Sequence, residues 1–404
     1  MDDDREKAIR DTNDWIAGQA LGDVDIEPLF VGVCERLAAA GVAIRRAHLA
    51  VPTLHPMVGA VSVRWLCGAA AEQMIYRRQP GPNPEWERSP LKQLEARNLR
   101  ELSISMEDED GEWRDFPLLV ELRETGFTDY LCFLTTFGSK SGGWKRRDGM
   151  LTSWATDRPG GFDDDDMAAL RRVQARLGVG VKMATREQTA LNIVTAYLGA
   201  NAGRRVLDGQ IQRGDGDSLH AVIWYSDLRG STPLAEGLSG PDFLALLNDY
   251  FECTAGAVLD HGGEVLRYIG DAVLAIFQVD GPSGDARAAR MALAAAQDAQ
   301  TRLVRLNRSR EGRGEDPIDF GLALHVGEVM FGNVGVPERI DFTVIGPAVN
   351  EVARLEGLTK TLGRRIVVSN AFSRLLPVDW EALGENTLRG VGSSHRVYAP
   401  PAAE

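Results

Sequence analysis

The sequence predicts an α+β protein with two folded domains and a helical connector between them. Its 404 residues exceed the usual size of one domain, and 44% of them are hydrophobic, which suffices for conventional cores. The pattern of residues changes twice along the chain. Residues 1–186 mix short strand-like runs with helical stretches, 187–218 carry a narrow apolar stripe followed by glycines, and 219–404 alternate strands and helices regularly. We therefore predict domains over 1–186 and 219–404, joined by a connector over 187–218.

Short strands and a closing helix define the first domain. The clearest strand-like runs are Ala47–Val51, Tyr130–Leu134 and Gly149–Trp154. After the four aspartates Asp163–Asp166, apolar residues recur with helical spacing from Met167 to Val181. Because acidic side chains stabilise the positive N-terminus of a helix, we interpret the aspartates as a helix cap rather than a metal site. His48 and His55 accompany an apolar strand and are interpreted as structural residues.

The connector contains a narrow apolar stripe formed by Ala190, Ile193, Val194, Tyr197 and Leu198. This spacing suits a helix that pairs with a second helix and carries a signal between domains. The alternative is a helix that lies on its own domain. The pattern alone leaves both interpretations open.

The second domain has a regular order of elements. A β-prone run at Leu219–Tyr225 precedes a helix that starts near Ser239 and Pro241. Two further strand-like runs, Val265–Ile269 and Ala272–Phe277, flank a short turn and predict a hairpin. The order predicts a βαββαβ core with its helices on one face of an antiparallel sheet.

Composition excludes several classes of partner. The formal net charge is −13 and no basic stripe stands out, which argues against nucleic acid. Four widely spaced cysteines in apolar segments, Cys34, Cys67, Cys132 and Cys253, indicate free thiols in a reducing compartment. No apolar run approaches the ~20 residues that span a bilayer, and the acidic N-terminus does not resemble a signal peptide. We expect a cytoplasmic protein without a membrane partner.

Two acidic turns carry the chemistry of the second domain. Asp227 lies in the turn Ser226–Thr232, and Asp271 lies in Arg267–Ala272. Each aspartate ends an apolar strand-like run, so the two carboxylates are expected side by side at one edge of the sheet. Paired carboxylates of this kind hold divalent metal ions against a triphosphate.

These turns, together with Phe342–Gly346 and Val349–Arg354, occur in the order and spacing of one family. Most of Leu219–Pro400 resembles the class III adenylyl/guanylyl cyclase catalytic domain, which implies a ferredoxin-like fold. The first domain resembles GAF-like sensory domains more weakly, through Asp157–Phe162 and the helix that follows. That second resemblance implies an unknown small-molecule ligand at the N-terminal domain, or dimerisation.

The cyclase resemblance implies roles for individual residues. Asp227, Asp271 and the carbonyl of Leu228 are expected to hold two divalent ions, Mg²⁺ or Mn²⁺. Asn350 would orient the ribose, and Arg354 would neutralise charge on the α-phosphate. The expected phosphate-binding residues are Arg229, Gly230, Ser231, Thr232 and Arg389. In this family the metal and transition-state residues of one site come from different subunits, so a homodimer with two shared sites is expected. The alternative for Arg354 is a surface ion pair with Glu351 or Glu356.

Base recognition is expected at Arg267 and Thr343. Related adenylyl cyclases commonly have lysine where Arg267 stands, while guanylyl cyclases typically have glutamate there. The resemblance therefore favours adenylate cyclase activity, which converts ATP to 3′,5′-cyclic AMP and pyrophosphate. A guanidinium also suits the O6/N7 edge of guanine, so a guanylate cyclase is the first alternative. A degenerate nucleotide-binding regulator is the second.

Overall fold

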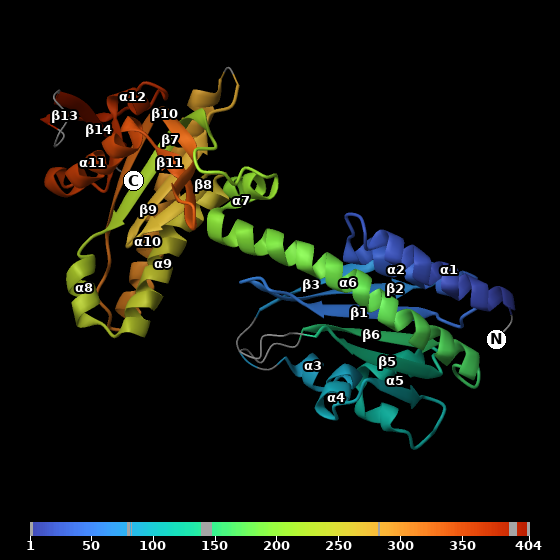
Figure 1. Ribbon diagram of the computed structural model, residues 1–404. Helices are drawn as coiled ribbons and strands as arrows, with labels where there is room; N and C mark the ends of the chain where they lie inside the picture. The colour runs from blue at the N-terminus through green and yellow to red at the C-terminus, as the bar shows by residue number, and fades with distance from the viewer. Residues whose placement is uncertain are drawn as a thin grey trace. The chain divides into compact units, whose positions relative to one another are not determined.

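The computed structural model describes residues 3–78, 81, 83–138, 148–281, 283–387 and 394–401. The chain divides into two compact units, Met1–Ala196 and Tyr197–Glu404 (Figure 1). In the described ranges, no helix combines the length and apolar character needed to cross a membrane.

The first unit is built on a six-stranded antiparallel sheet with the order β3-β2-β1-β6-β5-β4. Its strands are β1 (Arg46–Pro52), β2 (Val58–Leu66), β3 (Glu72–Arg77), β4 (Glu101–Ser105), β5 (Asp129–Thr136) and β6 (Gly149–Thr156). One face shares a core with α1 (Asp3–Gln19), α2 (Ile26–Ala39) and α6 (Asp164–Leu198). The other face packs against α3 (Pro84–Glu87), α4 (Pro90–Ala96), η1 (Glu112–Asp115) and α5 (Pro117–Glu124).

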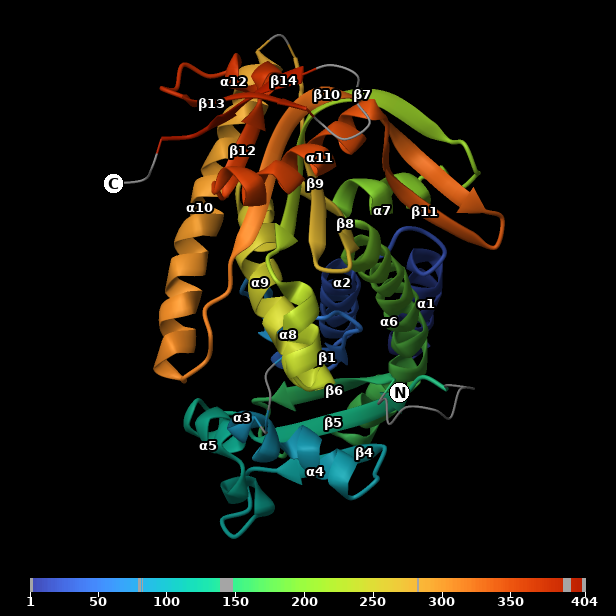
Figure 2. The same cartoon turned by 90° about the vertical axis from the view of Figure 1, so that its left-hand side faces the viewer.

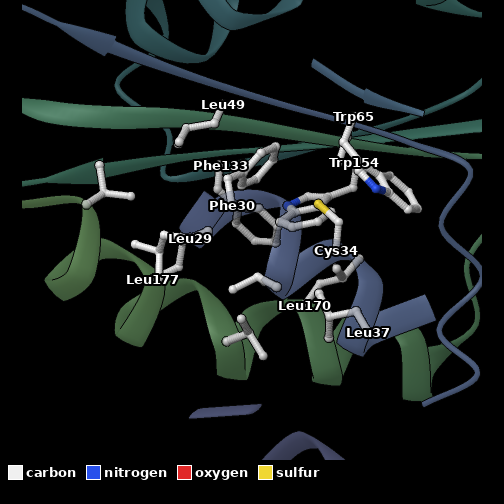
Figure 3. Packing of buried hydrophobic residues seen from close by; sticks show 14 of the residues in the cluster. Leu29, Phe30, Cys34, Leu37, Leu49, Trp65, Phe133, Trp154, Leu170 and Leu177 are labelled. Carbon is white, nitrogen blue, oxygen red and sulfur yellow. The ribbon is translucent and has the colours of Figure 1, made fainter. Parts of the chain in front are cut away.

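Aromatic side chains fill the core between the sheet and the longer helices. Figure 3 shows Phe30 of α2 beside Trp154 of β6, and their ring centroids lie 5.7 Å apart. Leu170 and Leu177 of α6 are fully buried in the same cluster. Because both faces of this sheet are covered, most residues of β5 and β6 are buried, including polar ones such as Thr152 and Ser153.

The acidic run Asp163–Asp166 caps the N-terminus of α6, as predicted. The Asp166 N–H donates to the Asp163 carboxylate at 2.8 Å, and the Asp163 N–H donates back to Asp166 at 3.4 Å. The Asp166 side chain is fully buried, where it pairs with Arg5 of α1 and with Arg158. Asp166 therefore ties the start of α6 to α1 and to the loop after β6.

The surroundings of His48 and His55 agree with the interpretation of both as structural residues. Burial, together with the charges of Arg46 and Arg64, lowers the pKa of His48 to about 3, so this imidazole is neutral. His55 Nδ1 accepts the N–H groups of Met57 and Val58 in a local turn. The described residues contain no group of three or more potential metal-ligating side chains.

The residues between the two sheets form regular structure. α6 is one helix of 35 residues that continues to Leu198, and Gly199, at φ 87°, separates it from α7 (Ala200–Leu207). Leu198 and Val206 pack against the core of the second unit. The apolar stripe of α6 stays exposed at Ile193 and Tyr197 in a single chain. Residues 187–218 therefore comprise the end of α6, α7, a turn-rich segment over 208–215 and the first residues of β7.

The second unit contains the predicted βαββαβ core (Figure 2). Its elements are β7 (Gly216–Leu228), α9 (Gly240–Asp260), β8 (Glu264–Ile269), β9 (Ala272–Gln278), α10 (Gly284–Gly312) and β10 (Phe320–Val336), with the short α8 (Ser231–Gly237) before α9. The strand order is β10-β7-β9-β8, and every pair is antiparallel. The side chain of Ser239 caps α9, and both core helices share one hydrophobic cluster with the same sheet face.

The prediction of helices on one face is confirmed for the two core helices, and further helices cover the opposite face. α11 (Pro347–Leu362) and α7 pack on the opposite face. They can do so because β7 and β10 have apolar side chains on both faces. In β10, Leu322 and Leu324 belong to the core with α9 and α10, whereas Ala323 belongs to the core with α11. The sheet is also not purely antiparallel, since β12 (Ile366–Ser369) pairs parallel with β10. The remaining elements are β11 (Arg339–Ile345), α12 (Asn370–Ser373), β13 (Glu381–Thr387) and β14 (Ser394–Ala399).

We predict that Asp166→Ala destabilises the first unit by about 3 kcal/mol, because it leaves Arg5 and Arg158 without their shared buried partner. Asp164→Ala, an exposed member of the same run, is the matched control and should cost less than about 1 kcal/mol. Urea unfolding of the two variants and the wild type measures both values. Equal losses would show that the run stabilises α6 only through its overall charge.

Candidate active site

The fold brings Asp227 and Asp271 together at one edge of the second sheet. Asp227 is near the end of β7 and pairs in register with Ala272, the residue after Asp271. Gly270, at φ 64°, provides the left-handed conformation that the tight turn before Asp271 requires. The two carboxyl groups are close enough to share a hydrogen bond. The sequence-based pairing of these two aspartates is therefore present in the structure.

A third carboxylate, Glu356 of α11, lies beside this pair. It packs against Gly321 of β10, which is opposite Asp227 in the sheet. A Cβ on Gly321 would lie 2.1 Å from Glu356 Oε1 and 2.3 Å from Thr359 Oγ1, so a larger residue would displace these side chains. Burial and the charges of Asp271 and Glu356 raise the pKa of Asp227 to about 7. Burial also raises the pKa of Glu356.

This donor set fits divalent cations. Carboxylate and carbonyl oxygens are the ligands that Mg²⁺ and Mn²⁺ prefer, and a cation between the Asp227 and Asp271 carboxylates would relieve their repulsion. Asp227 and Asp271 are the residues that would hold the ions. The Leu228 N–H donates to the Asp227 carboxylate and orients it.

Buried hydrogen bonds hold the end of β7 in place. Trp224 Nε1 donates to Ser226 Oγ at 3.1 Å, and the Tyr250 hydroxyl of α9 donates to the same oxygen at 3.4 Å. Burial raises the pKa of Tyr250, so its hydroxyl keeps its proton. Tyr225 lies two residues before Asp227 on the same strand face, and burial and Asp227 raise the pKa of its phenol as well.

The turn after β7 contains most of the predicted phosphate-binding residues. Gly230 has φ 69°, and Ser231 and Thr232 open α8, where helix geometry gives the first N–H groups no carbonyl partner. Arg229 is engaged inside the domain. Its N–H donates to the Asp319 carbonyl at 2.8 Å, and its guanidinium contacts the Asp319 carboxylate at 2.9 Å. Its other Nη donates to the carbonyl of Arg364 at 3.0 Å.

Arg229 thus ties the turn to the C-terminal end of α11, and its role toward phosphate stays a prediction. Arg389, the other predicted phosphate-binding residue with a cationic side chain, lies outside the described residues.

The predicted base-binding residues lie on β8 and β11, which contact each other without pairing in the sheet, and no hydrogen bond or ion pair joins the two side chains within the described residues. Arg267 of β8 forms an ion pair with Asp341 of β11. Thr343 is two residues further along β11 and is nearly buried. Asp341 was not predicted from the sequence, although its two-residue spacing from Thr343 on a strand places it on the same face.

Asn350 and Arg354 line a separate hollow of about 470 Å³ at the N-terminal part of α11, together with Gly346, Pro347 and Glu351. Residues 350 and 354 are one helical turn apart and share a face. Glu356 is about 200° around the helix from Arg354, and it is Glu356 that packs toward Asp227. One chain therefore does not bring its own Arg354 to its own Asp227.

The alternative surface ion pairs of Arg354 are not formed. Glu351 is bracketed by His325 and His395, at 3.7 and 3.3 Å, and Glu356 accepts a hydrogen bond from Thr359 at 3.2 Å. Within the part of the chain that the structure describes, no ion pair engages the exposed Arg354. Sequence reasoning treated Glu356 only as a partner for Arg354, because its place beside Asp227 depends on how α11 packs on β10.

Comparisons with known proteins concern the second unit. A family model described as the adenylate and guanylate cyclase catalytic domain matches residues 217–399. The chain is 36% identical to an adenylate cyclase of Anabaena cylindrica over 170 residues, which is 41% of this chain and 32% of that protein. It is 31% identical to adenylate cyclase 1 of Rhizobium meliloti over 147 residues, which is 36% of this chain and 22% of that protein.

The chain thus spans about a third or less of the length of these two curated relatives. Among solved structures, the adenylyl cyclase CyaB from P. aeruginosa is similar at 23% identity with a TM-score of 0.43. That similarity covers 47% of this chain and 97% of the CyaB chain.

We predict that Asp227→Asn stabilises the metal-free protein at neutral pH. A carboxyl whose pKa is raised in the folded state weakens folding as pH rises from about 4 through about 7. After solvent screening is allowed for, the variant should exceed the wild type by about 1–2 kcal/mol at pH 8 and match it near pH 4. Urea unfolding in EDTA measures this difference.

Asp249→Asn, at an exposed position of α9, is the control and should show no such pH dependence. In a parallel thermal-shift assay, Mn²⁺ should stabilise the wild type more than Asp227→Asn. A stability difference that stays constant from pH 4 to pH 8 would contradict the carboxylate repulsion described above.

Proposed function

We propose that the protein converts ATP into 3′,5′-cyclic AMP and pyrophosphate. The proposal starts from the class III adenylyl/guanylyl cyclase catalytic domain that the C-terminal half of this chain contains. The observation that carries the proposal is the crowding of Asp227, Asp271 and Glu356 at the end of β7. A folded protein accepts such repulsion where a cationic group completes the site. The divalent metal ions that accompany the triphosphate of a nucleotide are such cationic groups.

Each group of site residues is proposed to perform a different part of the cyclisation reaction. Two divalent ions, when bound by Asp227 and Asp271, supply activation of the ribose 3′-hydroxyl and neutralisation of phosphate charge. The N–H groups at the start of α8, which lack carbonyl partners in the helix, are proposed to bind the β- and γ-phosphates. Asn350 orients the ribose, and Arg354 stabilises the negative charge that grows on the α-phosphate as pyrophosphate leaves.

The site is proposed to form between two copies of the chain. Asn350 and Arg354 face away from the Asp227 of their own chain, so a second copy has to supply them. The arm formed by β10 and β11 supports this arrangement. It exposes Met330, Val334 and Val336, and Ile345 lies opposite Met330 on the same face. An exposed apolar strip of this kind favours contact with a partner, and a two-fold symmetric dimer has two equivalent sites.

ATP is the proposed substrate because the two relatives described above are named adenylate cyclases. Guanylate cyclase activity is the second candidate, since a guanidinium at position 267 also suits the guanine edge. The presence of Asp227, Asp271, Asn350 and Arg354 disfavours a degenerate regulator.

The first unit is proposed as a GAF-like sensory domain that binds a small ligand and regulates the cyclase. The proposal is supported by its sheet, by the Asp157–Phe162 turn and by α6, which leads from this sheet to the second unit. The four thiols without disulfides, three of them buried, support a reducing, cytoplasmic location.

We predict that the full-length chain forms cyclic AMP from ATP with Mg²⁺ or Mn²⁺, with kcat/KM at least about tenfold higher than for GTP. Product formation is measured by chromatography for each nucleotide and metal. Asp271→Asn should reduce turnover by about 10²-fold or more, because it removes a metal ligand. A preference for GTP would favour the guanylate cyclase alternative instead.

We also predict complementation between inactive variants. Asp227→Ala and Arg354→Ala are each inactive alone, but their heterodimer retains one intact site. After subunit exchange of an equal mixture, half of the dimers are mixed, so about a quarter of wild-type activity should return. The matched control mixes Asp227→Ala with Asp271→Ala, which leaves both sites defective. Activity that returns equally in both mixtures, or in neither, argues against shared sites.

A further inference from the structure

The ion pair between Arg267 and Asp341 places a donor and an acceptor side by side where the base is expected. β8 and β11 contact each other, and the pair spans them. The side chains of Arg267 and Asp341 are 39% and 49% exposed, so both polar groups remain reachable from solvent. Thr343, the acceptor expected from the sequence, is only 6% exposed.

We propose that Asp341 reads the purine base together with Arg267, and that its carboxylate accepts a hydrogen bond from the exocyclic amino group. This inference rests on the proposed function and specifies how that site chooses its base. Asp341 is thereby assigned as a specificity-determining residue, in the place expected for Thr343.

The hydrogen-bonding capacity of the two groups allows this role. A carboxylate has more acceptor positions than one guanidinium contact occupies, and a guanidinium has more donors than one carboxylate contact uses. The Watson–Crick edge of adenine presents an amino donor beside a ring-nitrogen acceptor, which complements an acceptor beside a donor. Arg267 is also fixed in direction by Asp341, whereas an unpaired arginine would have to lose side-chain entropy on binding the base.

Deleting the amino group from the substrate tests the assignment directly. Purine riboside triphosphate lacks the 6-amino group of ATP and is otherwise the same. A hydrogen bond to a charged acceptor makes the wild type prefer ATP by about 10–100-fold in kcat/KM. In Asp341→Ala the preference should fall below about threefold, mainly through a higher KM for ATP. Asp341→Asn keeps an acceptor oxygen and should retain an intermediate preference.

Two further variants distinguish base recognition by Asp341 from a general effect of charge on the arm and from base recognition by Thr343. Glu338→Gln, at the exposed tip of the same arm, is the matched charge control and should leave both the rate and the preference unchanged. Thr343→Val removes the competing hydroxyl and should leave the ATP preference in place. The inference is overturned if Asp341→Ala slows both nucleotides equally with the preference intact, or if Thr343→Val abolishes the preference.

A binding measurement separates failure of this inference from failure of the proposed function. If the wild type cyclises neither ATP nor GTP, the proposed function fails. Calorimetric dissociation constants for ATP and purine riboside triphosphate in Mn²⁺ then test Asp341 without turnover. A wild-type preference for ATP that Asp341→Ala removes supports the inference, and equal binding of the two nucleotides by the wild type overturns it.

Discussion

The repulsion among three carboxylates at the end of β7 is the constraint on which the second unit depends. Placing Asp227, Asp271 and Glu356 together weakens the fold, and the surrounding residues compensate by rigid support. The Ser226 hydroxyl is held by Trp224 and Tyr250, and Arg229 connects the following turn to Asp319. A cation that binds there would restore part of this stability, because it would bind the folded chain and not the unfolded one.

Two different faces of helix α11 carry residues of the proposed active site. One side packs on the sheet and carries Glu356 to the carboxylates, while another presents Asn350 and Arg354 to an open hollow. Because an α-helix is rigid over this length, the two groups of residues cannot be turned toward the same point. A catalytic centre that needs both groups therefore needs two helices. The exposed apolar arm of β10 and β11 offers a surface through which a second copy can approach.

The sequence was most informative where structure is set locally. The hairpin around Asp271, the Ser239 cap of α9, the Asp163–Asp166 cap of α6 and the order of the βαββαβ core all follow from short patterns of a few residues. It was least informative where distant segments meet. Three features depend on how β8, β10, β11 and α11 pack, which no local sequence pattern indicates. They are the position of α11 on the opposite face, the approach of Glu356 to Asp227 and the pairing of Arg267 with Asp341. The GAF-like assignment and the two-chain site remain proposals for the same reason.

The packing of Glu356 against Gly321 limits which residues fit at position 321 without rearrangement. The backbone of Gly321 is an ordinary strand conformation, so by local criteria alanine would be an acceptable replacement. The constraint comes instead from Glu356, whose carboxylate lies where a methyl group would be. A change that is neutral for strand formation would therefore displace a charged group beside Asp227 and Asp271.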